Sequence, residues 1–210
     1  KTTAKNTDIV NYKVRPSYYS VERQMKALAE KYPKLISTEV IGKSVQGRKI
    51  TAMKLGKGKN KALAVAGFHA REHITVSYLM RCAEEFAKAY HTKDGKFSGY
   101  YMKSLLNTYT LYLVPLVNPD GLQIVRGSAK PSVKVNYPID PATGKRLTLS
   151  DYKANANGVN LNKNFPFYWK TVKTKRTSPD PENYKGKSAA SEPETKALMK
   201  LCDKNKFLWM

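Results

Sequence analysis

The sequence predicts an α/β fold, with a mixed, mostly parallel sheet and helices packed on both of its faces. Two short and almost wholly apolar runs, residues 61–66 and 108–117, are typical of strands buried on both faces. Segments with the apolar spacing of helices follow at residues 73–91 and 191–204. Strands that alternate with helices favour a sheet covered by helices on both sides.

The first elements along the chain are a helix and a hairpin. Residues 20–32 have helical apolar spacing, with Ser20 as the expected N-cap. Residues 35–42 and 48–55 have strand character and are joined by a short polar segment that contains a glycine, which predicts a β-hairpin. The buried strand at 61–66 comes next.

The later elements alternate with long loops. The strand at 108–117 ends in a strong turn signal at residues 118–121, and Ser191 with Glu194 forms the capping-box pattern that opens the last helix. Residues 126–153 and 170–189 are expected to be irregular. The helix at 73–91 is expected to bury one apolar stripe, made of Ile74, Tyr78, Leu79, Cys82, Phe86 and Tyr90.

Length and composition indicate one main domain. The chain has 210 residues, 41% of them hydrophobic, and no apolar run long enough to span a membrane. Residues 1–17 are expected to form an N-terminal leader before a domain at 18–210. The polar start without a signal segment fits a processed secreted protein or a trimmed sequence. Cys82 and Cys202 are expected to be buried thiols, and a disulfide between them stays open.

The charge of the chain is strongly positive. There are 38 Lys and Arg residues against 16 Asp and Glu, which gives a net charge of +22. Such a field attracts polyanions, but no groove-reading motif is present, so specific nucleic-acid binding is not predicted. The lysines are scattered, which favours a solvated surface with general attraction to anionic envelopes such as cell-wall polymers.

The segment at residues 67–73 carries the clearest chemical signal. His69 and Glu72 lie three residues apart, where a buried strand is expected to end and a helix to begin. A His and a Glu at this spacing can bind one metal ion, or can form an ion pair at a helix start. The strand–glycine–helix context favours the metal. No C-x-x-C pattern offers a thiolate zinc site.

Five short motifs occur in order along the chain, at residues 41–48, 67–74, 117–121, 157–166 and 191–195. Together they resemble the zinc carboxypeptidase family, especially its bacterial branch that cleaves γ-D-glutamyl-diamino-acid bonds in cell-wall peptides. The resemblance covers residues 18–210. It implies a secreted or cell-wall-associated metallopeptidase with one zinc ion, acting on peptides such as peptidoglycan stem peptides.

The resemblance also implies roles for single residues. His69 and Glu72 would be two of three zinc ligands, and the metal would polarise the scissile carbonyl and activate a water. Asn162 and Lys163 would bind the terminal carboxylate of the substrate. Lys163 departs from the arginine usual in the family, and lysine lacks the planar fork that grips a carboxylate with two bonds. Arg71 would line the substrate cleft, against the alternative of a solvated arginine.

The oxyanion stabiliser is the least certain position in this comparison. Lys153, which follows Tyr152, is the candidate, with a plain surface lysine as the alternative. Arg126 is a competing candidate.

The family's third ligand, a histidine, and its general-base glutamate would both lie beyond Met210. His73 and His91 do not fit as replacements. Residues 18–210 are therefore expected to be the N-terminal two-thirds of a catalytic domain, lacking the C-terminal part of the fold and inactive alone. The alternative is a noncatalytic protein, derived from a peptidase, that binds anionic envelope polymers.

Overall fold

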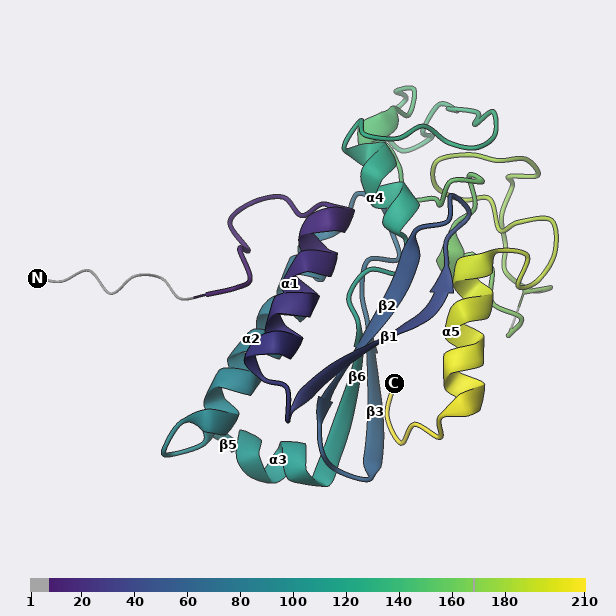
Figure 1. The fold of residues 1–210 in the computed structure, drawn as a ribbon. Helices are drawn as coiled ribbons and strands as arrows, with labels where there is room; N and C mark the ends of the chain where they lie inside the picture. Colours follow the sequence, from purple (N-terminus) through teal and green to yellow (C-terminus); the bar gives the residue numbers. More distant parts are fainter. Residues whose placement is uncertain (1–7, 168) are drawn as a thin grey trace, which may run out of the picture.

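A computed structural model describes residues 8–167 and 169–210 and has a four-stranded sheet at its centre (Figure 1). The strand order is β1-β2-β6-β3. The strands are β1 (Ile36–Lys43), β2 (Lys49–Gly56), β3 (Asn60–Val65) and β6 (Tyr109–Val114). The predicted hairpin and both predicted apolar strands are present.

The strand directions correct one prediction. The sheet is mixed as expected, but it is not mostly parallel in the described residues, since β1–β2 and β2–β6 are antiparallel and β3–β6 is parallel. The connection between β1 and β2 is a tight turn, and tight turns join antiparallel strands. The parallel pair is linked through long helical segments, as a parallel crossover requires.

Five helices and a small hairpin complete the described part of the chain. The helices are α1 (Tyr18–Lys31), α2 (His73–His91), α3 (Met102–Thr108), α4 (Pro119–Val125) and α5 (Pro193–Lys204). The hairpin consists of β4 (Lys96–Phe97) and β5 (Tyr100–Tyr101), and 3₁₀ turns lie at Leu149–Asp151 and Leu161–Lys163. None of the described helices is long and apolar enough to cross a membrane.

Helices cover both faces of the sheet, as the sequence predicts (Figure 1). Alternate residues of β2 point to opposite sides: Met53 and Leu55 pack with α1 and α2, whereas Ile50 and Ala52 pack with α5. This alternation follows from the two-residue period of a strand. The sheet therefore separates two apolar cores.

The face that α2 buries differs from the prediction. Ala83 and Ala87 are fully buried against the sheet, while Ile74 and Tyr78 are 66% and 70% exposed. Val76 and Met80 are buried on the same face of α2, and the residues of the predicted stripe lie beside the outer edge of β3 instead. There they line two hollows of about 460 and 200 Å³. The residues around these hollows are 62–66, Ile74, Thr75, Tyr78, Leu79, Cys82, Phe86, Leu111 and Leu113.

Helix starts also differ from the predicted caps. The N-cap of α1 is Ser17, which forms a capping box with Ser20. The N-cap of α5 is Glu192, one residue after the predicted cap Ser191, and its side chain makes no cap bond. Glu194 accepts hydrogen bonds in a buried network and does not close the predicted capping box. The predicted turn at residues 118–121 begins α4, whose first turn is capped by Asn118.

The segment before α1 is packed against the domain where it is described. The backbone N–H groups of Ile9 and Val10 donate to the buried carboxylate of Glu84 at 2.7 and 2.9 Å. Residues 1–7 of the expected leader lie outside the described residues. Cys82 and Cys202 are both half-buried free thiols.

Candidate metal and substrate site

A glycine turn places the His69–Glu72 segment at the carboxyl end of β3. Gly67 has φ of +65°, and a Cβ there would lie 2.9 Å from the Pro115 carbonyl oxygen, so only glycine fits. The Gly67 carbonyl accepts from the Asn118 backbone N–H at 3.0 Å, and Asn118 Nδ2 donates to the Phe68 carbonyl. Asn118 thus ties the ends of β3 and β6 together. Its full burial gives it a structural role.

The two predicted metal ligands face each other. His69 Nδ1 lies 3.0 Å from Glu72 Oε2, and the side chains are 15% and 43% exposed. Two ligand atoms of a tetrahedral zinc, each about 2.0–2.2 Å from the ion, lie about 3.3 Å apart. The spacing of this pair is therefore close to what a shared zinc ion requires, and a small opening of the pair would admit the metal.

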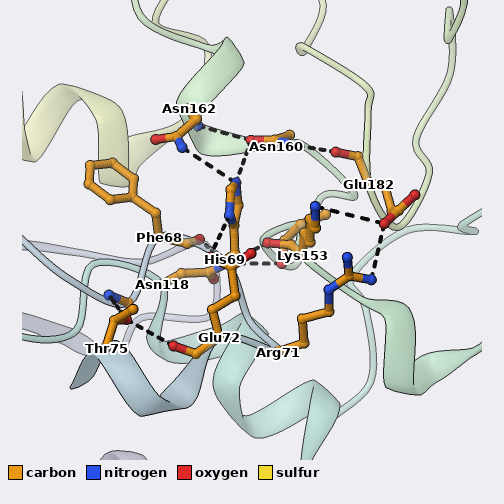
Figure 2. Close-up of polar contacts among 12 residues, drawn as sticks. Phe68, His69, Arg71, Glu72, Thr75, Asn118, Lys153, Asn160, Asn162 and Glu182 are labelled. Carbon is orange, nitrogen blue, oxygen red and sulfur yellow. Dashed lines mark hydrogen bonds and ion pairs between the residues drawn. The ribbon is translucent and has the colours of Figure 1, made fainter. Parts of the chain in front are cut away.

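Two asparagines lie at the other side of the His69 ring. Asn160 Oδ1 is 3.3 Å from His69 Nε2, and Asn162 Nδ2 is 3.5 Å from the same nitrogen (Figure 2). Asn160 also caps the 3₁₀ turn at Leu161–Lys163 by accepting from the Asn162 N–H. The predicted substrate residue Asn162 therefore lies at the predicted metal site.

Asn160 was missed by the sequence prediction, although it belongs to a motif that the sequence singled out. Its position two residues before Asn162 was the available signal. Asn160 Oδ1 lies at the His69 nitrogen that faces away from Glu72, and an oxygen at the second ring nitrogen is the contact that outer-shell groups make with ligand histidines in zinc sites.

Arg71 and Lys153 converge on a carboxylate from a distant loop. Arg71 Nη1 lies 3.1 Å from Glu182 Oε1, and Lys153 Nζ lies 3.9 Å from the same oxygen (Figure 2). Arg71 also donates to the Asp151 carbonyl at 3.0 Å. Hydrogen bonds from Thr148, with the charge of Arg71, hold the pKa of Asp151 below its usual value. Glu182 lies in a polar loop that gave no sequence signal.

Backbone bonds join the first motif to the segment that carries Lys153. The N–H groups of Ala70 and Arg71 donate to the carbonyls of Lys153 and Tyr152 at 3.1 and 3.0 Å. Lys153 is therefore held beside the turn that carries His69 and Glu72. Lys163 donates to Asn183 Oδ1 at 2.8 Å.

The other candidates lie elsewhere. Arg126 donates to the carbonyls of Arg15 and Pro16, which places its guanidinium at the segment before α1 and not at this site. His91 contacts the Ala87 carbonyl and stacks on Tyr32. Burial, with the charges of Arg15 and Arg126, lowers the pKa of His73.

The described residues supply fewer metal ligands than a catalytic zinc site normally has. Within residues 8–167 and 169–210, no group of three His, Cys, Asp or Glu side chains is placed to hold a metal ion. A catalytic zinc normally has three protein ligands and a water. His69 and Glu72 thus fit two positions of such a site.

Comparison with known proteins gives one consistent result. A family model described as zinc carboxypeptidase matches residues 21–210. The protein YqgT of Bacillus subtilis is 34% identical over 190 residues, which cover 89% of this chain and 50% of that protein. Gamma-D-glutamyl-L-diamino acid endopeptidase 1 of Lysinibacillus sphaericus is 31% identical over 203 residues, which cover 96% of this chain and 51% of that protein.

A solved structure agrees at the level of the fold. The crystal structure of thrombin activatable fibrinolysis inhibitor matches with a TM-score of 0.72 at 21% identity, covering 99% of this chain and 49% of that chain. The chain spans about half the length of the curated relatives and the solved chain that it matches.

Proposed function

Because this chain belongs to the zinc carboxypeptidase family, we propose that His69 and Glu72 are two of three protein ligands of a catalytic zinc in a peptidase. Residues 18–210 would be the N-terminal two-thirds of the catalytic domain. The observation that carries the proposal is the His69 ring, which has Glu72 at Nδ1 and Asn160 at Nε2. A metal-ligand histidine typically uses one nitrogen for the ion and donates the other N–H to an oxygen.

The residues around the ring have separate tasks in this proposal. A bound zinc would polarise the scissile carbonyl and lower the pKa of its water. Asn160 holds the His69 ring in the tautomer that leaves Nδ1 free for the ion. Lys153 lies beside the metal-ligand turn, where its ammonium would face negative charge that develops on the carbonyl oxygen.

In this proposal the substrate is bound by Arg71, Asn162 and Lys163. Arg71 and Lys153 both pair with Glu182, which positions the two cations at the site. A single carboxylate cannot neutralise both positive charges. Lys163 would hold the terminal carboxylate of the substrate as a point charge. The proposed substrates are peptides, with γ-D-glutamyl-diamino-acid bonds of cell-wall peptides as the class that the Lysinibacillus sphaericus relative supports. A secreted or wall-associated location belongs to the same proposal.

Zinc titration of the 210-residue chain tests the ligand assignment. We expect weak 1:1 binding, because the described residues supply two ligands. His69→Ala and Glu72→Ala should each weaken zinc binding at least about tenfold, since even outer-shell changes cost about 10–100-fold. Isothermal titration calorimetry measures the affinities, and peptidase turnover should stay negligible.

His91→Ala is the matched control, because His91 packs on Tyr32 away from the site. Its zinc affinity should equal that of the wild type. The ligand assignment would be wrong if His69→Ala left zinc binding intact. Tight zinc retention with chelator-sensitive turnover would show that the chain completes the site by itself.

The net charge of +22 favours a second candidate, a noncatalytic protein that binds anionic envelope polymers. Such binding should fall steeply with salt and should not change in His69→Ala. Cosedimentation with an anionic wall polymer at rising salt distinguishes it from peptide binding that depends on the metal site.

A further inference from the structure

A cavity of about 510 Å³ opens beside the metal-ligand site and is lined by an excess of cations. Its charged lining residues are Asp140, Lys163, Lys173, Lys175, Arg176 and Glu182. The cavity adjoins the site through two residues. Lys163 follows Asn162, which contacts the His69 ring, and Glu182 pairs with Arg71. A substrate bound at His69 could therefore extend into this cavity.

The two carboxylates in the cavity wall are already engaged. Glu182 pairs with Arg71 and Lys153, which lie outside the cavity lining. Asp140 accepts from the Ala142 N–H at 3.0 Å and from the Thr143 hydroxyl at 2.9 Å. Among the described residues, neither carboxylate forms an ion pair with Lys173 or Lys175.

Three of the four cations form no ion pair with a carboxylate among the described residues, and two of these three, Lys173 and Lys175, also have no amide partner. Arg176 Nε pairs with Asp180 Oδ2 at 3.0 Å, and Lys163 donates to Asn183. In the part of the chain that the structure describes, neither Lys173 nor Lys175 has a carboxylate within ion-pair distance. These two ammonium groups can therefore bind an anionic group of a ligand.

The loop that carries both lysines is fixed to the rest of the site. Thr174, between them, donates from its hydroxyl to the Asn183 carbonyl at 2.8 Å and accepts from the Arg176 N–H. Asn183 is also the partner of Lys163, so one residue bonds both to Lys163 and to the loop that carries the other two lysines. The backbone between Lys173 and Lys175 is thus fixed at the cavity.

We propose that this cavity binds a second carboxylate of the substrate, held by Lys173 and Lys175, in addition to the terminal carboxylate assigned to Lys163. The inference rests on the proposed peptidase function and narrows its substrate class to peptides with two anionic groups. A γ-glutamyl bond uses the side-chain carboxyl and leaves the α-carboxylate of the same residue free, three carbons from the scissile carbonyl. An α-peptide bond formed by a residue without an acidic side chain leaves no such group there.

The test compares two fluorescent dipeptide probes by anisotropy at low ionic strength. One is N-labelled γ-D-glutamyl-L-lysine with both carboxylates free, and the other carries a carboxamide in place of the glutamyl α-carboxylate. The wild-type chain should bind the diacid about three- to tenfold more tightly, as expected for two exposed ion pairs. Lys173→Gln/Lys175→Gln should reduce diacid binding to that of the amide and leave amide binding unchanged.

Lys34→Gln/Lys93→Gln is the matched control, since it removes the same charge from exposed lysines of other segments. It should keep the diacid preference. The His69→Ala variant should lose zinc binding and should still prefer the diacid probe to the amide probe. Failure of the metal assignment and failure of this proposal therefore give different results. Equal affinity for both probes, no measurable binding of either, or equal losses in the two double variants would overturn the proposal.

Discussion

Asp120→Ala is expected to lower the free energy of unfolding by about 3–5 kcal/mol, the range measured when one partner of a buried ion pair is removed. Asp120 is fully buried and accepts from Ser44 Oγ at 2.8 Å, the Gln46 N–H at 2.7 Å and Arg48 Nη1 at 2.6 Å. These bonds join the β1–β2 turn to the first turn of α4. Without Asp120, the Arg48 guanidinium and two further donors would lose their acceptor.

Urea denaturation followed by circular dichroism measures this loss. Glu30→Ala is the control, because the Lys26–Glu30 pair is exposed and exposed helix pairs contribute about 0.3–0.5 kcal/mol. If Asp120→Ala does not fold, Asp120→Asn retains the shape and removes the charge, and it should still be clearly less stable than Glu30→Ala. Equal stabilities for the Asp120 and Glu30 variants would contradict the prediction.

Raising the pH from about 4.5 to about 8 is expected to lower the free energy of unfolding of the wild type. The decrease should be about 3 kcal/mol larger than in the Glu194→Gln variant. Burial raises the pKa of Glu194 to about 7, from an ordinary value of 4.5. The carboxyl lies between the Val45 N–H and Asn155 Nδ2, which donate to its two oxygens at 3.2 and 3.1 Å.

The sign of this effect follows from proton binding. Between pH 4.5 and 7 the folded chain holds the Glu194 proton while the unfolded chain has released it. The protonated Glu194 carboxyl therefore makes its full contribution to stability below about pH 4.5, and this contribution is lost as the pH rises through 7. The amide introduced by Glu194→Gln cannot ionise, so the difference between the two unfolding curves isolates this group.

Denaturation at a series of pH values provides the measurement, with exposed Glu30→Gln as the control whose curve should run parallel to that of the wild type. The prediction fails if the Glu194→Gln curve is also parallel. Such a result would mean that folding does not raise the pKa of Glu194.

Local sequence signals predicted the His69–Glu72 pair and the main elements. His69 and Glu72 lie within one turn, so their spacing alone brings them together at 3.0 Å. The apolar runs of β3 and β6 are short and bounded by turn signals, which favours strands over helices. The same signals could not give strand direction, since the β2–β6 pairing depends on the path of the intervening chain.

Contacts between distant residues were outside the reach of these patterns. Glu182 reaches Arg71 from a loop without periodicity, and Glu194 forms a buried bond with Asn155 instead of the cap that its spacing predicted. The apolar stripe of α2 was visible in the sequence, but the face turned to the core holds Val76, Met80, Ala83 and Ala87. Which apolar face is buried depends on the packing partners of the helix, and apolar spacing alone does not give these partners.

The outer edge of β3 has a geometric consequence for the proposed metal site. Ala62 forms a parallel bridge with Trp209, and the Leu63 N–H donates to the Trp209 carbonyl at 2.9 Å. A strand advances about 3.3 Å per residue, so any segment that extended this pairing would draw level with Val65 within about three residues. It would then emerge beside the turn that carries His69 and Glu72. A third ligand of the proposed zinc would therefore have a direct approach along this edge.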